Sequence, residues 1–142
     1  MKFKVGAVYF AILGIVASLF GGLHVALAAT GREIMVNLLV ASGSMWCLWK
    51  GIILFSAGIF ILVGASDLKN IHGLGKTTLG SIMIWIIAGS NIFGRILSSI
   101  PGEETWFNTL DGFLATYSPP YEPALWLLPF TLVILHFIWR SK

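Results

Sequence analysis

The stretch MWCLWKGIILFSAGIFILVGA, residues 45–65, is predominantly apolar and contains a single charged residue, Lys50. A helix needs about 20 predominantly apolar residues to cross the hydrocarbon core of a bilayer, so this stretch predicts a transmembrane helix. Three further apolar stretches lie before and after it, at residues 5–29, 77–100 and 123–139. Lipid offers the backbone no hydrogen-bond partners, and none of the stretches alternates as barrel strands do. All four are therefore predicted to be helices.

The composition of the chain leaves little sequence for an aqueous domain. Of its 142 residues 57% are hydrophobic and 11% are charged, which is far from the average soluble protein. The connections between the apolar stretches are too short to build a second core. We therefore predict a single all-α transmembrane domain over residues 1–142, folded as a four-helix bundle that can form a homo-oligomer.

Basic residues are concentrated on one side of the predicted spans. The formal net charge is +3. The cations expected on the first side are Lys2, Lys4, Lys69, Lys76, Arg140 and Lys142, with the single acid Asp67. The other side combines Arg32, Lys50 and Arg95 with the acids Glu33, Glu103, Glu104, Asp111 and Glu122. The positive-inside rule then predicts a multi-pass protein of the cell membrane with both termini in the cytoplasm. Basic residues at a membrane edge attract anionic lipid, and no clustered patch indicates nucleic acid.

A cleaved signal peptide is the alternative interpretation of the first span. Lys2 and Lys4 precede an apolar run that ends in VALAA at residues 25–29, which resembles an A-x-A cleavage site. Cleavage after Ala28 would leave three helices. The apolar run over residues 5–23 is longer than a usual signal core of about 7 to 15 residues, which favours a retained helix.

Small residues recur at four-residue spacing in two of the spans, a pattern that lets helices approach closely in lipid. They are Gly14, Ser18 and Gly22 in the first span and Ser90, Gly94 and Ser98 in the third. We expect them to form helix interfaces, although small residues are also common in membrane helices in general. In the fourth span Pro129 predicts a kink that fits the helix to the bundle.

Polar side chains inside the spans fall at one depth, because alternating helix direction brings His24, Lys50, Asn91 and Arg95 to the outer leaflet. A charge at the bilayer centre costs roughly 2.5 to 3.5 kcal/mol on insertion scales, so such residues usually face a cavity, a partner or the surface. We therefore predict a ligand-binding site at these four residues. Alternatively, Lys50 and Arg95 extend to the headgroups, and His24 is a hydrogen-bonded histidine of the bundle.

No motif for catalysis or metal binding is present in the sequence. Cys47 is the single cysteine, and His24, His72 and His136 are expected at different depths, which does not suit paired haem ligation. The stretch GLGKTT at residues 73–78 lacks the spacing of a phosphate-binding loop, and we predict a tight cytoplasmic turn there. No catalytic residue, metal ligand or cofactor is assigned.

Two connections are predicted on the outer side. Residues 30–44 combine apolar and charged side chains in a pattern typical of a short helix lying in the interface. Residues 101–122 alternate acids with aromatic residues and are expected to fold over the mouth of the bundle. This second connection either acts as a lid, with Glu103, Glu104 or Asp111 as counter-ions, or only satisfies its own backbone at the surface.

Two short motifs resemble a known group of proteins. GGLH at residues 21–24 and WCLWKG at residues 46–51 are similar to the G-x-x-H and W-x-x-W-x-G patterns of small bacterial four-helix membrane proteins, broadly the DoxX-like group. The resemblance covers the first two helices and implies a four-helix bundle. Some DoxX-like proteins are associated with quinone-linked redox chemistry, but no motif for that activity is found in this chain.

Three classes of function are compatible with these patterns. The preferred hypothesis is a non-enzymatic membrane protein that binds a lipid-like or small anionic ligand at the outer leaflet, or serves as a subunit of a membrane complex. The second is a quinone-linked redox enzyme or subunit that uses His24 in proton transfer. The third is an oligomeric transporter, although the chain has no visible inverted repeat and no charge at the midplane.

Overall fold

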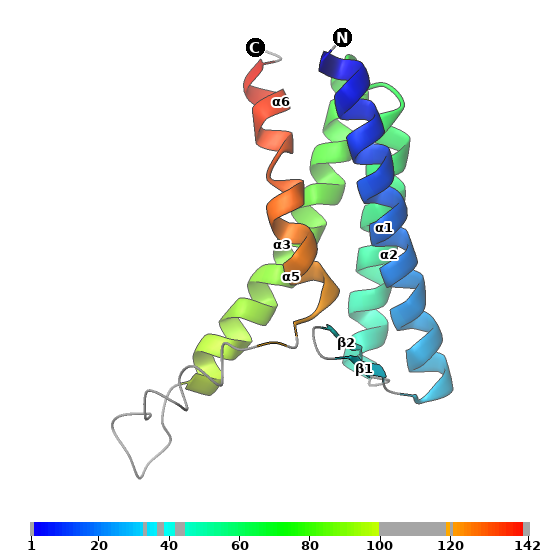
Figure 1. Cartoon of the computed structure of the whole chain (residues 1–142), viewed down its shortest axis with the longest axis vertical. Coiled ribbons are helices and arrows are strands. Elements are labelled where there is room, and N and C mark those ends of the chain that lie inside the picture. The colour runs from blue at the N-terminus through cyan, green and yellow to red at the C-terminus, as the bar shows by residue number, and fades with distance from the viewer. Residues whose placement is uncertain are drawn as a thin grey trace.

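Three long helices and a broken fourth one make up most of the described chain. The computed structural model describes residues 2–32, 34–36, 39–41, 45–99, 119 and 121–140. In chain order the elements are α1 (Lys2–Thr30), β1 (Ile34–Val36), β2 (Leu39–Ala41), α2 (Met45–Ala65), α3 (Ile71–Ser99), α5 (Pro123–Thr131) and α6 (Ile134–Arg140). The start of α1 and the end of α6 lie at one end of the bundle, here called the terminal end, and the two strands lie at the opposite hairpin end (Figure 1).

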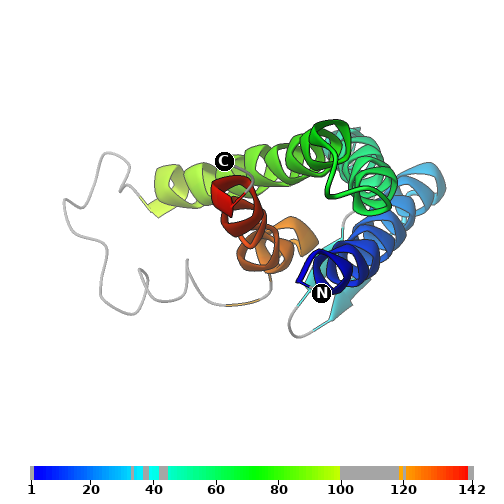
Figure 2. The same ribbon diagram turned by 90° about the horizontal axis from the view of Figure 1, so that it is seen from above.

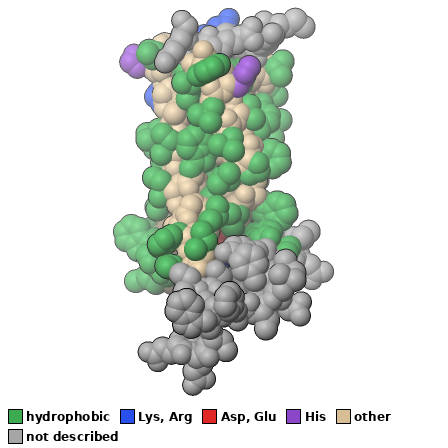
Figure 3. Space-filling model, turned by 90° about the vertical axis from the view of Figure 1, so that its left-hand side faces the viewer, with side chains coloured by type: hydrophobic (Ala, Val, Ile, Leu, Met, Phe, Trp, Pro, Cys, Tyr) green, Lys and Arg blue, Asp and Glu red, His purple; other side chains and the backbone are tan. Residues whose placement is uncertain are grey.

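The described helices have the length and composition of membrane spans. Three of them qualify by both criteria, namely Lys4–Thr30, Met45–Ala65 and Ile71–Leu97, and Pro123–Trp139 is a shorter apolar segment. Figure 3 shows hydrophobic side chains spread over the helices between the two ends. The predicted helical fold is therefore confirmed, and α2 has the predicted bounds.

The interface between α1 and α2 depends on glycine. A methyl group at Gly14 would lie 2.7 Å from Cγ of Leu62 and 2.9 Å from the carbonyl oxygen of Gly58. A methyl group at Gly21 would collide with the backbone nitrogen of Phe55. Because these contacts involve backbone atoms, a side chain at either glycine would push the helices apart.

The prediction of small residues in α1 is therefore confirmed at Gly14 and wrong at Gly22. A methyl group at Gly58 would collide with Oγ of Ser18, so Ser18 also belongs to the interface. At Gly22 the nearest atom would be 4.0 Å away, and this residue is partly exposed. Two helical turns take about seven residues, so Gly21, and not Gly22, returns to the face of Gly14.

The interface predicted in α3 from Ser90, Gly94 and Ser98 is wrong where it can be assessed. Ser90 and Gly94 are exposed, and a methyl group at Gly94 would meet nothing within 4 Å. The side chain of Ser98 lies outside the described part of the chain. Figures 1 and 2 show the reason, because α3 leaves the other helices toward the hairpin end. It packs on α2 nearer its start, where a methyl group at Gly80 would lie 2.6 Å from the carbonyl oxygen of Ala57.

The start of α3 differs from the prediction as well. Residues 73–78, predicted as a tight turn, and His72, predicted in the loop, belong to α3, and the turn is made by residues 66–70. Gly73 has no room for a side chain beside the carbonyl of Asp67, so it allows the end of α2 to approach α3 closely. Thr77 Oγ1 donates to the carbonyl oxygen of Gly73 at 3.1 Å, within the helix.

The connection after α1 is a β-hairpin, so the predicted interfacial helix over residues 30–44 is wrong. β1 and β2 pair antiparallel, with Ile34 opposite Ala41. Gly31, with φ of 63°, ends α1, and the amide of Arg32 donates to the carbonyl of Leu27 at 3.3 Å. This left-handed glycine cap stops the helix, after which the β-branched and apolar residues favour strands.

The fourth span is broken as well as kinked. α5 ends at Thr131 and α6 begins at Ile134, with Pro129 inside α5. At the break Tyr9 donates its hydroxyl to the carbonyl oxygen of Phe130 at 2.9 Å, and Trp85 Nε1 donates to Thr131 Oγ1 at 2.7 Å. The last carbonyls of a helix lack intrahelical partners, so the bond from Tyr9 supplies one. α1 and α3 thus hold the fourth span at its break.

Replacing Gly21 and its neighbour Gly22 separately should give opposite results. Gly21→Leu places a side chain against the backbone of Phe55, whereas the first carbon added at Gly22 only reaches ordinary contact, 4.0 Å, with the Phe55 side chain at the edge of the interface. Overpacking typically costs about 1–3 kcal/mol, so we expect a clearly lower unfolding temperature in detergent for Gly21→Leu and a nearly unchanged one for Gly22→Leu. Equal losses in both variants would contradict this interface.

Candidate functional site

Three side chains form a hydrogen-bonded polar cluster at the hairpin end: Lys50 of α2, Asn91 of α3 and Glu122, which directly precedes α5. Lys50 Nζ lies 2.7 Å from Glu122 Oε1 and donates to Asn91 Oδ1 at 3.0 Å. Asn91 Nδ2 donates to Glu122 Oε2 at 2.6 Å. Both carboxylate oxygens of Glu122 are therefore occupied, and the cluster joins three elements.

The ion pair in this cluster is partly buried. The side chains of Lys50 and Glu122 are 26% and 28% exposed. A charged group in a transmembrane segment usually needs a partner of opposite charge, and the pair supplies one for each of the two. Removing a single partner leaves the other charge uncompensated, which is much more costly than removing both. The polar cluster therefore joins the start of α5 to α2 and α3 through groups that depend on one another.

A second cation lies next to the polar cluster. Arg95 is one helical turn beyond Asn91 on α3, and its guanidinium carbon lies 4.8 Å from the ring centroid of Tyr121, a cation–π contact. Tyr121 in turn packs edge-to-face against Trp126, with ring centroids 5.7 Å apart. Because Tyr121 and Glu122 are consecutive, the segment before α5 contacts both cations.

The structure brings together three of the four residues predicted for the site. Lys50 and Asn91 share the cluster, and Arg95 lies beside it over Tyr121. The ammonium of Lys50 is held by Asn91 and Glu122, which is not the outward extension that snorkelling to the headgroups requires. That these residues bind a ligand stays a prediction.

His24 does not join the polar cluster. Its Nδ1 lies 2.8 Å from the carbonyl oxygen of Phe20 in the same helix, and the residue is only 3% exposed. A carbonyl oxygen can only accept, so Nδ1 carries the proton. A methyl group at Gly51 would lie 2.8 Å from Cβ of His24, which places the histidine in the interface between α1 and α2. This environment fits the alternative of a hydrogen-bonded histidine within the bundle.

Glu122 is the counter-ion that the sequence interpretation missed. The predicted counter-ions Glu103, Glu104 and Asp111, with most of the predicted lid, lie outside the described residues. Glu122 stands at the N-cap of α5 but makes no capping bond with its side chain, which binds Lys50 instead. The sequence does contain an indication of this role, because Glu122 lies closer to a predicted span than any other acid on that side.

The described residues form no candidate metal centre, and comparison with known proteins identifies no relative of the chain. Within the described residues no three side chains from His, Cys, Asp and Glu are placed to hold a metal ion. No family model matches the chain, and no curated protein and no solved structure is significantly similar to it. The resemblance to the DoxX-like group is thus neither supported nor contradicted.

The polar cluster predicts strong coupling between Lys50 and Glu122. We expect Lys50→Gln or Glu122→Gln alone to lower the free energy of unfolding by about 1–3 kcal/mol, between the values for exposed and buried ion pairs. The double variant should lose less than the sum of the two, because no charge is left unpaired. Thermal or denaturant unfolding in mild detergent measures the free energy of unfolding of all three variants. Strictly additive losses would show that the two residues do not interact.

Proposed function

We propose that this chain is a non-enzymatic, multi-pass membrane protein that binds an anionic, lipid-like ligand at its hairpin end. The carrying observation is the meeting of basic side chains and aromatic rings there. Lys50, which is paired with Glu122, and Arg95, which stacks on Tyr121, lie at the same end of the bundle. Basic residues at a membrane edge attract anionic lipid.

Arg95 is the residue that we expect to meet the ligand. The charge of Lys50 is balanced by Glu122, so Lys50 mainly holds the cluster together. A guanidinium can donate two parallel hydrogen bonds to a phosphate or carboxylate while its face stays on an aromatic ring. Tyr121 and the 42% exposed Trp126 supply the aromatic residues typical of a membrane interface. The apolar part of the ligand would lie in the surrounding lipid.

The proposed orientation follows from the basic residues at the other end. Lys4 of α1 and Lys69 of the turn between α2 and α3 both line one pocket at the terminal end. The positive-inside rule places this end in the cytoplasm and the polar cluster in the outer leaflet of the cell membrane. The redox hypothesis gains no support, because His24 is enclosed between α1 and α2, and the transporter hypothesis gains none from the described residues.

Native mass spectrometry of the full chain released from nanodiscs that contain anionic and neutral lipids tests this proposal. We expect the unchanged protein to retain anionic lipid and Arg95→Gln to retain one anionic lipid fewer, while both unfold at similar temperatures. Arg32→Gln is the matched control, since Arg32 is an exposed cation on the same side of the spans and outside the cluster. Equal retention by Arg95→Gln, or an equal loss in the control, would refute the assignment.

A further inference from the structure

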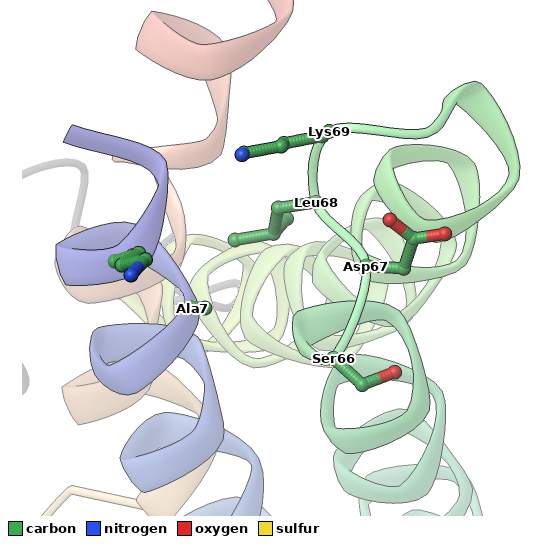
Figure 4. A pocket seen from close by; sticks show the side chains of 6 residues that line it. Ala7, Ser66, Asp67, Leu68 and Lys69 are labelled. Atoms are coloured by element: carbon green, nitrogen blue, oxygen red, sulfur yellow. The ribbon is translucent and has the colours of Figure 1, made fainter. Parts of the chain in front are cut away.

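A pocket of about 230 Å³ opens at the terminal end, between α1 and the turn that connects α2 to α3 (Figure 4). Its lining consists of Lys4, Ala7, Ser66, Asp67, Leu68 and Lys69. In Figure 4 the side chain of Lys69 extends toward α1, whereas the carboxylate of Asp67 points away from it. Within the described residues neither lysine belongs to an ion pair. Two lysines therefore line the pocket, and the acid that lines it with them pairs with neither.

An apolar groove of about 420 Å³ adjoins this pocket on α1. It is lined by Lys4, Val5, Val8, Tyr9 and Ile12, so Lys4 belongs to both. The members repeat at helical spacing along one face of α1 and lead from the terminal end into the membrane-spanning segment. Val5, Val8 and Ile12 are 67%, 61% and 59% exposed. The pocket lined by lysines thus adjoins a shallow, open apolar surface of α1, and Lys4 belongs to both.

We infer that this pocket and groove bind one anionic phospholipid, with its phosphate between Lys4 and Lys69 and an acyl chain along Val5, Val8 and Ile12. Lysine ammonium groups bind phosphate as point charges. A lipid uses both parts of the site, whereas a free phosphate leaves the apolar groove empty. The cytoplasmic leaflet, which the terminal end faces in the proposed orientation, is the leaflet that attracts polybasic segments. This site lies at the opposite end from the polar cluster and does not depend on Arg95.

A titration of phosphatidylglycerol into the detergent-purified full chain, followed by native mass spectrometry, tests the inference. A lysine near an anionic lipid surface contributes about 1 kcal/mol, or about fivefold in affinity, so Lys69→Gln should weaken binding about fivefold and Lys4→Gln with Lys69→Gln still more. Lys76→Gln is the matched control, since Lys76 is exposed on α3 and does not line the pocket. Lys4 and Lys69 are both exposed, so each can be replaced without disturbing a buried contact. Circular dichroism verifies that the variants keep the helical fold.

The outcomes separate this site from the other candidates. Loss of binding in Lys69→Gln with retention in Lys76→Gln supports it, and an equal loss in both variants overturns it in favour of general charge attraction. If millimolar inorganic phosphate displaces the bound phosphatidylglycerol as effectively as added lipid does, the ligand is a free phosphate and the lipid assignment is overturned. Arg95→Gln should leave this lipid bound, so failure here and failure of the site at the hairpin end are recognised independently.

Discussion

Contact between the backbones of α1 and α2 is the constraint on which the remaining packing depends. Lipid tails are as apolar as the helix surfaces, so burial of hydrophobic side chains gives helices little reason to associate in a membrane. Association then has to come from close fit, and Gly14, Gly21 and Gly58 remove the side chains that would prevent it. The same close fit encloses His24 against Gly51, and the ring bonds to the Phe20 carbonyl of its own helix.

The hairpin end is organised differently, by charge. There α3 diverges from the other helices (Figure 1). Hydrogen bonds among Lys50, Asn91 and Glu122 join α2, α3 and the segment before α5. The two ends thus use the two means of association available in lipid, which are close backbone packing and polar bonds between helices. A ligand at Arg95 would add to the second kind of contact and leave the first unchanged.

Features set by short-range patterns could be predicted, and features set by a distant partner could not. The bounds of α2 follow from the apolar run itself, in which Lys50 is the single charged residue. The choice between Gly21 and Gly22 depends on which face α2 occupies, and the pairing of Lys50 with Glu122 joins residues 72 positions apart. The hairpin was missed because strands of three residues carry too little periodicity to distinguish them from a short helix. In the candidate site, Lys50, Arg95 and Asn91 could be predicted from their expected depth in the membrane. Glu122 could not, because depth alone does not identify a partner.

The position of Glu122 after α2 and α3 in the sequence also bears on biosynthesis. Chains are made from the N-terminus, so α2 and α3 are synthesised before the segment that carries this carboxylate. Until α5 arrives, the ammonium of Lys50 has Asn91 but not Glu122 as a partner. The hydrogen bonds that join α2 and α3 to the segment before α5 can therefore form only after both of these helices have been made.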